Sequence, residues 1–485
     1  MKRLLTIVLA GLSLAARAQS TLSLDSCMLM AERSNLQLAI GAEKVRRAKA
    51  EAQAARTNYL PKVSLAAGYM RSGREVQLLS DGQINTLNNV GTATATQLGN
   101  MAQQIVAQHP DLAALVQGIG AYLPQLAEQG NALGHTITDA FHTDTRNMTV
   151  GTVLLTQPLY MGGKIRAYDR ITRRQGELAE SQLEAARRDL RLDVERTYWQ
   201  IASLAGKKRL APQYRDMLKQ LQGDVQKMHA EGLATKASCL QVDVKLNEAE
   251  MALTKVDDAL TLLRMVLCRL CGLPLDSRPV LADEGEASVA HDTTPVQPDA
   301  SLALAQRPEM QQLALAEQML DDKVRITRSD MLPQLALTGG YLLSNPSVFN
   351  SFERKFKGTW GVGVMLKMPV WNWGETRYKV RAAKSDAAIA RLETADARNK
   401  ITLQVTQEAF RVNEAVQRLT LSLRSMDTAA ENLRTASLGF TEGVITTTDL
   451  LQAQTAWLQA HNDVIDARIE TRLARAAYHH ALGEK

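Results

Sequence analysis

The chain repeats its own pattern of residues, and this repetition restricts its possible folds more than any other feature of the sequence. Glu231-Gly232-Leu233 matches Glu442-Gly443-Val444, at residue numbers that differ by 211. The same offset separates further matching residues, in the pairs Pro158 and Pro369, Val194 and Val405, and Gly272 and Gly483. A fixed offset of this kind indicates that one structural unit is built twice. We therefore expect a first structural repeat over 19–272 and a second over 301–485.

An insertion distinguishes the first repeat from the second. Tyr59-Leu60-Pro61 matches Met331-Leu332-Pro333 at a larger offset, so the additional residues lie in the first repeat. They fall at about 72–147, a region rich in Gln, Asn, Thr, Ala and Gly, where we expect helices near 96–107 and 111–130. Between the repeats, residues 273–300 contain four prolines and are expected to form an irregular connector.

Each repeat is expected to run helix, strand, strand, long helix, turn, long helix. The opening helices fall at about 24–58 and 300–330, and the long helices before the turns at about 164–229 and 375–440. Because proline removes a backbone donor, Pro212 is expected to kink or interrupt the first of these long helices. This order of elements predicts an α+β fold that is mostly helical.

The helix after each turn carries an apolar seam with spacings that alternate between three and four residues, which is typical of a coiled coil. The first seam is Cys239, Val242, Leu246, Ala249, Leu253, Val256, Leu260, Leu263, Leu267 and Leu270. The second is Leu450, Ala453, Trp457, Ala460, Val464, Ala467, Thr471, Ala474, Tyr478 and Ala481. Alanine fills every other position of the second seam, which would let helices approach closely. A coiled coil without a transport function remains an alternative interpretation of these seams.

Four segments alternate apolar residues with small or polar ones, at about 63–69, 149–159, 333–343 and 359–370. Most of them have the length of tilted strands that span a membrane. Aromatic residues in and beside these strands are expected at the membrane interface, namely Tyr69, Tyr341, Trp360, Trp371 and Trp373. A sheet in a soluble domain remains the alternative.

Four strands cannot close a barrel by themselves, and open strand edges are not stable in lipid. A membrane-spanning sheet of this chain must therefore pool its strands with copies of the same chain. Two copies give eight strands, which make a barrel filled by its own side chains, whereas three copies give twelve strands with room for a passage. A homotrimer is expected if the barrel conducts.

The first residues have the pattern of an export signal. Lys2 and Arg3 precede an apolar segment at 4–16, and Ala16-Arg17-Ala18 offers a cleavage site, so residues 1–18 are expected to be a signal peptide. No later apolar stretch is long enough for a membrane helix. The formal net charge is +6, and its acidic and basic residues are interspersed along helices, which does not indicate a nucleic-acid partner.

No pattern in the sequence indicates a catalytic residue, a cofactor or a metal site. The chain has no H-E-x-x-H, no G-x-S-x-G and no phosphate-binding glycine loop. One cluster has metal-ligating residue types, but a solvated loop is its preferred interpretation; it comprises His135, Asp139, His142 and Asp144.

Cysteine chemistry is not expected to organise the chain either. Four cysteines do not make a disulfide framework in a chain of this length. Cys268 and Cys271 form a C-x-x-C pair that lacks a second pair to complete a metal site. Cys27 follows a faint lipoprotein-like signal, but it lies too far beyond the apolar segment for lipidation to be expected.

These features resemble the TolC family of outer-membrane efflux and secretion ducts. The resemblance rests on Arg307-Pro308-Glu309, on the Leu60-Pro61 and Leu332-Pro333 pairs before strands, and on the two turns, of which the second reads Glu442-Gly443-Val444-Ile445-Thr446-Thr447-Thr448-Asp449-Leu450-Leu451. It implies a trimeric, twelve-stranded transmembrane β-barrel in the outer membrane of a Gram-negative bacterium, in contact with its lipid. A periplasmic α-helical coiled-coil barrel would continue it, and the helix turns would dock a periplasmic adaptor protein attached to an inner-membrane pump of RND or ABC type. The insertion would face outside the cell.

The resemblance also implies two kinds of site. The adaptor-docking tips map to Gly232, Leu233, Ala234 and Thr235, and to Gly443, Val444, Ile445 and Thr446. The periplasmic constriction maps to Asp449 and Gln452, and three Asp449 carboxylates about one axis would repel one another and raise their pKa values. Helix capping by the glycines and by Asp449 remains an alternative for these residues. The alternative function is a trimeric coiled-coil envelope scaffold or adhesin without a through-channel.

Overall fold

A computed structural model describes residues 21–484, apart from 74, 76–78, 109, 111–112, 143, 285–293 and 348–353. The predicted signal peptide lies outside the described residues. Contacts divide the chain into two compact units, and each unit draws on both halves of the sequence. The helical unit comprises the residues up to 55, 166–327 and 377–485, and the sheet unit comprises 56–165 and 328–376.

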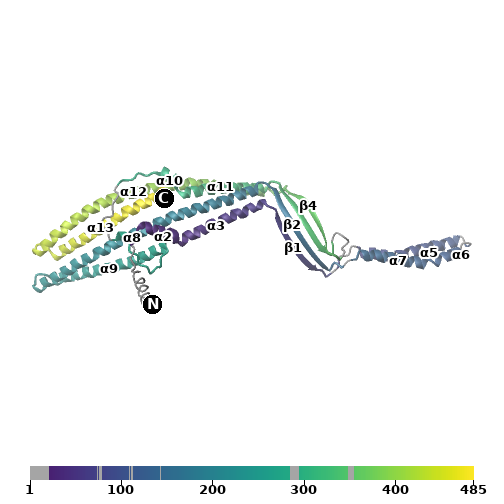
Figure 1. The fold of residues 1–485 in the computed structure, drawn as a ribbon, viewed down its shortest axis with the longest axis horizontal. Helices are drawn as coiled ribbons and strands as arrows, with labels where there is room; N and C mark the ends of the chain where they lie inside the picture. Colours follow the sequence, from purple (N-terminus) through teal and green to yellow (C-terminus); the bar gives the residue numbers. More distant parts are fainter. Residues whose placement is uncertain are drawn as a thin grey trace, which may run out of the picture. The chain divides into compact units, whose positions relative to one another are not determined.

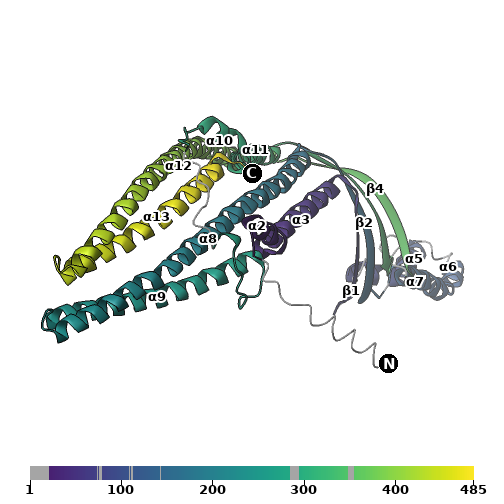
Figure 2. The same ribbon diagram turned by 60° about the vertical axis from the view of Figure 1, so that its left-hand side comes forward.

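Two long helical hairpins dominate the helical unit (Figures 1 and 2). The first hairpin is α8 (Lys164–Ala230) followed by α9 (Lys236–Cys271), and the second is α12 (Glu375–Thr441) followed by α13 (Thr447–Leu482). Both first helices have 67 residues and both second helices have 36. Each helix of the second hairpin begins at the same offset from its counterpart as the matching turns in the sequence.

The predicted apolar seams are the buried faces of α9 and α13. Cys239, Val242, Leu246 and Ala249 of α9 pack against α8 in one core cluster. Ala474, Tyr478 and Ala481 of α13 pack in another cluster that includes residues of α12. All seam residues of α13 are buried except Trp457, which is half-buried. Burial of these seams is the main apolar contribution to the stability of both hairpins.

Pro212 does not interrupt α8, so of the kink or interruption that we expected, the interruption is wrong. The helix continues through the proline for its full length. Leu210 and Tyr214 on either side are buried, and so is Leu218 one turn later. Packing of these side chains offsets the backbone hydrogen bond that proline removes.

The opening helices are each divided in two, where we expected single helices. In the first repeat, α2 (Leu24–Ser34) ends at Asn35 and α3 (Leu36–Arg56) follows, with a short 3₁₀ turn, η1 (Thr57–Tyr59), after it. The Asn35 Nδ2 donates to the Leu270 carbonyl at 3.2 Å, and its Oδ1 accepts from the Gln37 N–H at 2.8 Å. These bonds hold the extended backbone of Asn35 (φ −71°, ψ 122°) between the helices.

The second division has a sequence signal that we did not use. Helix α10 (Ala300–Gln306) ends at Arg307, and α11 (Pro308–Ser329) begins at the next residue. Arg307 is extended, with φ −70° and ψ 130°. A residue before proline is disfavoured in the helical conformation, so Pro308 itself marks the boundary.

The sheet unit contains one antiparallel sheet in the order β1-β2-β3-β4 (Figure 1). Its strands are β1 (Lys62–Arg71), β2 (Asn147–Met161), β3 (Gln334–Asn345) and β4 (Lys357–Lys367), so all four predicted strands are confirmed. Register pairs Tyr69 with Thr149 and Tyr341 with Trp360. Among the described residues, β1 and β4 are the edges, and neither edge pairs with a further strand.

The insertion is more helical than predicted. It contains α4 (Asp81–Asn88), α5 (Val90–Gln108), α6 (Ala113–Gly120) and α7 (Leu123–Ala140) in its described residues, instead of two pieces. Ser80 and Gln83 form a capping box at the start of α4, a signal present in the sequence. Glycines let the helices approach, because a Cβ at Gly91 would collide with the Ala127 carbonyl and one at Gly134 with the Leu87 carbonyl.

Two smaller features complete the described chain. Leu22 forms a parallel bridge with Leu281, just before the short 3₁₀ turn η3 (Ala282–Glu284) in the connector. No helix in the described ranges combines the length and the apolar character needed to cross a membrane.

Candidate functional site

The turns between the long helices share one backbone geometry. Gly232 and Gly443 have left-handed φ values of 78° and 73°. Their N–H groups donate to the carbonyls of His229 and Phe440 at 3.0 and 3.1 Å, while the next residues, Leu233 and Val444, donate to the carbonyls of Met228 and Gly439, both at 2.8 Å. This pair of bonds is a Schellman motif, which ends a helix and leaves its last carbonyls satisfied. The C-cap role of both glycines is therefore present in the structure.

The turns also share a pattern of exposure. Leu233 and Val444 are 75% and 78% exposed. The following residues, Ala234 and Ile445, are half-buried against the core cluster that lies next to the turns. Each turn therefore holds one apolar side chain inward and presents another to solvent.

Threonine N-caps start the returning helices, but the two caps differ. Thr235 Oγ1 accepts from the Ser238 N–H at 3.2 Å. At the matching position, Asp449 completes a capping box: its Oδ2 accepts from the Thr446 N–H at 3.1 Å and from the Thr446 hydroxyl at 2.7 Å. These donors lower the pKa of the Asp449 carboxyl below its usual value of 3.8. In the single chain, then, the direction is opposite to the one that repulsion around a trimer axis would cause.

A groove lies beside the turns, between α9 and α13. Its cavity volume is about 930 Å³. Gln452 lines it, and the Thr448 hydroxyl bridges to Gln241 Oε1 at 3.2 Å across the helices. Leu240 and Val244 of α9 also line the groove and are about half exposed. The groove offers an apolar surface with amide and charged groups at its rim, which suits a protein partner better than a small polar substrate.

The groove residues Leu240 and Val244 were missed in the sequence. Both lie outside the buried seam of α9, at positions where a solvated coiled-coil helix normally carries polar residues. Their spacing of four residues places them on one helix face. An apolar pair off the seam was the available signal.

The five aromatic residues named in the sequence lie in the strands or directly after β4. Tyr341 and Trp360 are opposite each other on β3 and β4, and Trp360 is 76% exposed. Trp371 and Trp373 follow β4 and contact each other in a T-shaped arrangement with ring centroids 5.6 Å apart. The Tyr69 hydroxyl donates to Asn147 Oδ1 at 2.9 Å. All five side chains are exposed in the single chain.

Outward-facing apolar residues extend this surface along both edge strands. They are Val63 and Leu65 on β1 and Val362, Val364 and Leu366 on β4, each more than 60% exposed, and most of the residues between them are small. A soluble sheet would bury such a face. This exposed face needs a lipid or protein environment.

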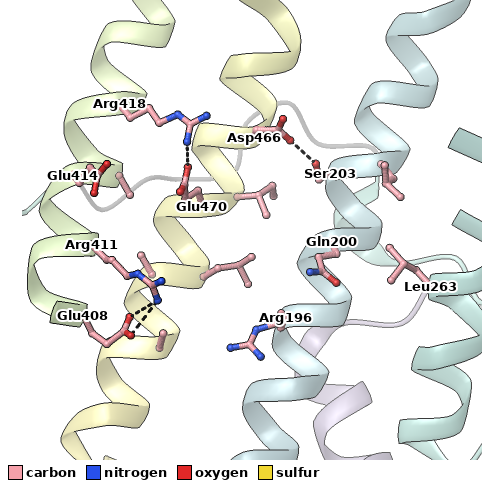
Figure 3. A pocket seen from close by; sticks show the side chains of 16 residues that line it. Arg196, Gln200, Ser203, Leu263, Glu408, Arg411, Glu414, Arg418, Asp466 and Glu470 are labelled. Carbon is pink, nitrogen blue, oxygen red and sulfur yellow. Dashed lines mark hydrogen bonds and ion pairs between the residues drawn. The ribbon is translucent and has the colours of Figure 1, made fainter. Parts of the chain in front are cut away.

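A second cavity, of about 870 Å³, lies between the two hairpins and is lined by charged residues of α8, α12 and α13 (Figure 3). Arg418 and Glu470 form an ion pair at 2.8 Å, and Arg411 pairs with Glu408 at 3.2 Å. Asp466 contacts the Ser203 hydroxyl at 3.2 Å and Lys207 at 2.7 Å. Most of the charged side chains in this lining are paired, and apolar side chains such as Leu263 and Leu473 line the rest of the cavity.

No metal site is formed by the described residues. No group of three or more His, Cys, Asp or Glu side chains in this part of the chain could hold a metal ion. Among the four residues for which a solvated loop was our preferred interpretation, Asp144 pairs with Arg146 at 2.9 Å and with Arg354 at 2.5 Å.

Known proteins match this chain in sequence and in fold over most of its length. A sequence model of the outer membrane efflux protein family matches residues 29–272 and 300–484. The alkaline protease secretion protein AprF of Pseudomonas aeruginosa is 25% identical over 367 residues, which are 73% of this chain and 75% of that protein. Outer membrane protein TolC of Vibrio cholerae is 24% identical over 192 residues, 38% of this chain and 44% of that protein. The crystal structure of the outer membrane protein VceC from Vibrio cholerae has the same fold, with a TM-score of 0.70 at 15% identity over 95% of this chain and 96% of that one.

Proposed function

The chain belongs to the outer membrane efflux protein family, and on this premise we propose that three copies form one passive exit duct for a tripartite efflux or secretion system. Membership confirms the resemblance to the TolC family, a family of outer-membrane channel proteins that extend into the periplasm. Family membership therefore identifies the chain as an efflux or secretion channel of the outer membrane. The trimer, the barrel and the docking partners are proposals.

The open sheet carries the proposal of a trimer. Strands β1 and β4 have no further strand beside them in the described chain, and both expose apolar side chains. Unpaired strand edges are not stable in lipid, so β4 of one copy would pair with β1 of the next. Three copies would supply twelve strands, which leave a passage, whereas eight would be filled by their own side chains. Outer-membrane lipid would contact the apolar face.

The long hairpins would continue the duct. Three copies would bring α8, α9, α12 and α13 together as twelve helices, two 67-residue and two 36-residue helices from each chain. We propose that residues 19–272 and 301–485 are two structural repeats, and that 273–300 is the connector between them. The charged side chains around the cavity between the hairpins would then line water-filled space.

The turns would receive the partner proteins. We assign Gly232–Thr235 and Gly443–Thr446 to docking of a periplasmic adaptor, because Leu233 and Val444 are exposed beside an apolar groove. The adaptor would connect the duct to an inner-membrane pump of RND or ABC type. Asp449 and Gln452 would lie at the periplasmic constriction.

Single-channel recording of the purified protein tests the duct. We expect a detergent-stable trimer whose insertion in a planar bilayer produces discrete conductance steps. Cysteines placed in β1 and β4 at facing outer positions should cross-link copies into a trimer. A trimer that never conducts would instead support an envelope scaffold or adhesin, and a β-rich monomer at all concentrations in detergent would contradict the assembly itself.

Adaptor docking is tested by cross-linking at the turns. A photoreactive residue in place of Val444 should capture an adaptor in cells, while the same residue in place of Leu262, an exposed leucine far along α9 from the turn, should not. Capture at Leu262 alone would remove the docking assignment.

A further inference from the structure

Three of the four cysteines meet where the first helix of the chain lies against the end of α9. Cys27 belongs to α2, and Cys268 and Cys271 belong to the last turn of α9. All three side chains are buried, with exposed fractions of 0%, 0% and 1%. The fourth, Cys239, lies in the core cluster near the turns. All four are free thiols in the structure.

Cys27 and Cys271 face each other. The Cys271 thiol donates to the Cys27 carbonyl oxygen, with Sγ 3.5 Å from that oxygen. The proximity of the two thiols raises the pKa of Cys271 and lowers that of Cys27. Cys268 is directed elsewhere, since its thiol donates to the Ser277 carbonyl at 3.6 Å in the connector. The close pair is therefore the one whose members are far apart in the sequence, rather than the C-x-x-C pair.

The backbone on both sides of this pair is fixed by other contacts. Asn35, at the end of α2, bonds to the Leu270 carbonyl. Leu22, just before α2, accepts from the Ala282 N–H at 3.0 Å and donates to the Val280 carbonyl at 2.9 Å. Gly272, with φ 70°, ends α9 so close to Ser34 that a Cβ would collide with its side chain. The two thiols are thus held together from both ends of α2.

We propose that Cys27 and Cys271 are joined by a disulfide bond in the exported protein. The proposal rests on the extension of these channel proteins into the periplasm, where α2 and α9 would lie. It does not depend on the trimer or on adaptor docking. Exported proteins fold where thiol oxidants act on cysteine pairs, whereas cytosolic thiols stay reduced. A disulfide requires the Cα atoms of its two cysteines to lie within about 7 Å of each other. The contact from the Cys271 thiol to the Cys27 carbonyl brings these two residues together.

The oxidant would be a periplasmic dithiol–disulfide exchange protein in its oxidised form. One cysteine thiolate attacks the oxidant disulfide and forms a mixed disulfide, releasing one thiol of the oxidant. The second cysteine thiolate then attacks the bonded sulfur of its partner and releases the other. The Cys27–Cys271 bond forms, two protons leave the two thiols, and the oxidant takes up two electrons as a dithiol. Because both thiols are buried in the folded chain, the exchange takes place before α2 closes on α9.

The bond would fasten the first helix of the mature chain to the end of the first hairpin. Its two cysteines lie 244 positions apart, and a longer closed loop restricts the unfolded chain more strongly. The second repeat has no matching pair of cysteines, since the remaining two are Cys239 and Cys268. The disulfide at the end of α9 would therefore have no counterpart in the second repeat.

Counting thiols in the denatured protein tests the proposal. Full-length protein made in a bacterium with an oxidising periplasm is trapped in acid, denatured, and labelled with a maleimide–polyethylene glycol. We expect two labels without reductant and four after reduction. The assay reads denatured chains, so it is informative even for variants that assemble poorly. Four labels without reductant would overturn the proposal.

Serine variants identify the pairing. Cys27→Ser and Cys271→Ser should each give three labels without reductant, because each frees its partner. Cys268→Ser and Cys239→Ser should each give one label and keep the bond. If Cys268→Ser gives three labels and Cys27→Ser gives one, the C-x-x-C pair is the disulfide and the proposal is wrong. A Cys27 that stays unlabelled after reduction and carries the mass of an acyl group would show lipidation and would also overturn it.

Discussion

The two helical hairpins have the same backbone and different chemistry at their turns. Their helices match in length, their glycines are both left-handed, and both returning helices begin with a threonine cap. The residues in the last helical turn before those glycines are nevertheless of different types. Glycine and the N-cap oxygen are the groups that the turn requires, so the remaining positions are free to serve contacts with other molecules.

The two hairpins differ in the residues that immediately precede their turns. His229 and Lys227 occupy the positions that Phe440 and Leu438 hold in the second hairpin. His229 Nδ1 contacts the Ala234 carbonyl at 2.9 Å across the first turn, while Phe440 packs with the core cluster beneath the second. A partner that covers both turns would therefore meet the exposed Lys227 before one and the exposed Leu438 before the other.

The largest expected effect is the loss of docking when a turn glycine is replaced. Gly232→Glu and Gly443→Glu force a side chain into left-handed backbone, at a cost of ~1–2 kcal/mol, and place a charge on the docking surface. We expect each to reduce adaptor affinity at least about tenfold, as for a residue at the centre of an interface, and to abolish export while the trimer persists. The matched control is Gly223→Glu, at a glycine inside α8 with open space around it. Normal drug resistance or secretion in cells that carry either turn variant would refute the docking role.

A smaller effect is expected where the strands pass into the long helices. Gly162 has φ 62°, and a Cβ there would lie 2.9 Å from Leu332 Cβ and 2.9 Å from the Ser329 carbonyl. Its counterpart in the second repeat is Trp373, with φ 53°, which is 85% exposed. Gly162→Ala should lower the stability of the protein by about 2 kcal/mol through strain and crowding.

Trp373→Ala is the comparison for that measurement. Its backbone already accommodates a side chain, so we expect only the loss of the ring contact with Trp371, about 1 kcal/mol or less. Thermal unfolding of both variants in detergent provides the readout. Equal losses at the two positions would show that the crowding around Gly162 is not what distinguishes the repeats.

A moderate change in ion selectivity is expected from Asp449→Ala. The counterpart of Asp449 is Ser238, so only the second turn of each chain has a carboxylate at this place. If three Asp449 carboxylates line a narrow mouth, their removal should reduce cation selectivity and weaken block by multivalent cations in a bilayer recording. Ser238→Ala, the matched control, should change neither property. Unchanged selectivity in the aspartate variant would leave Asp449 only its capping role.

The pH dependence of the same property follows from the capping box. Because Thr446 lowers the pKa of Asp449 below 3.8, the carboxylate stays charged as the pH falls to its usual titration range. Its contribution to helix capping and to selectivity is thus present above pH 3.8 and is lost as the pH falls through the lower, folded value. If selectivity is instead lost at a pH well above 3.8, repulsion between the Asp449 carboxylates of the three copies raises their pKa more than the capping box lowers it.

The smallest effect is expected from shortening the insertion. The second repeat joins its two strands by the short segment 346–356, whereas the first uses α4 to α7. Replacing residues 80–140 by a short glycine–serine linker should leave the amount of trimer in the outer membrane unchanged, because the helices pack mainly on one another. Loss of the trimer from the outer membrane fraction would show that the insertion supports assembly.

Local patterns in the sequence determined the strands, the long helices, the buried seams and the two turns. Each of these depends on residues a few positions apart: alternation for β1 and β4, heptads for α9 and α13, and a glycine followed by a threonine cap at each turn. The recurrence of each pattern in both halves of the chain strengthened every one of them. The capping box at Ser80 and the break before Pro308 were equally local, and our interpretation overlooked both.

Only the tertiary structure decided the features that depend on distant contacts. Buried neighbours keep α8 continuous through Pro212, and the Leu270 carbonyl holds the break at Asn35. The groove beside the turns needs α9 and α13 to lie together, and the pairing of Cys27 with Cys271 needs α2 to return to the end of α9. A single local pattern carries no information on which distant residue will complete it, because the free energy of such a contact comes from packing between elements that lie far apart in the sequence.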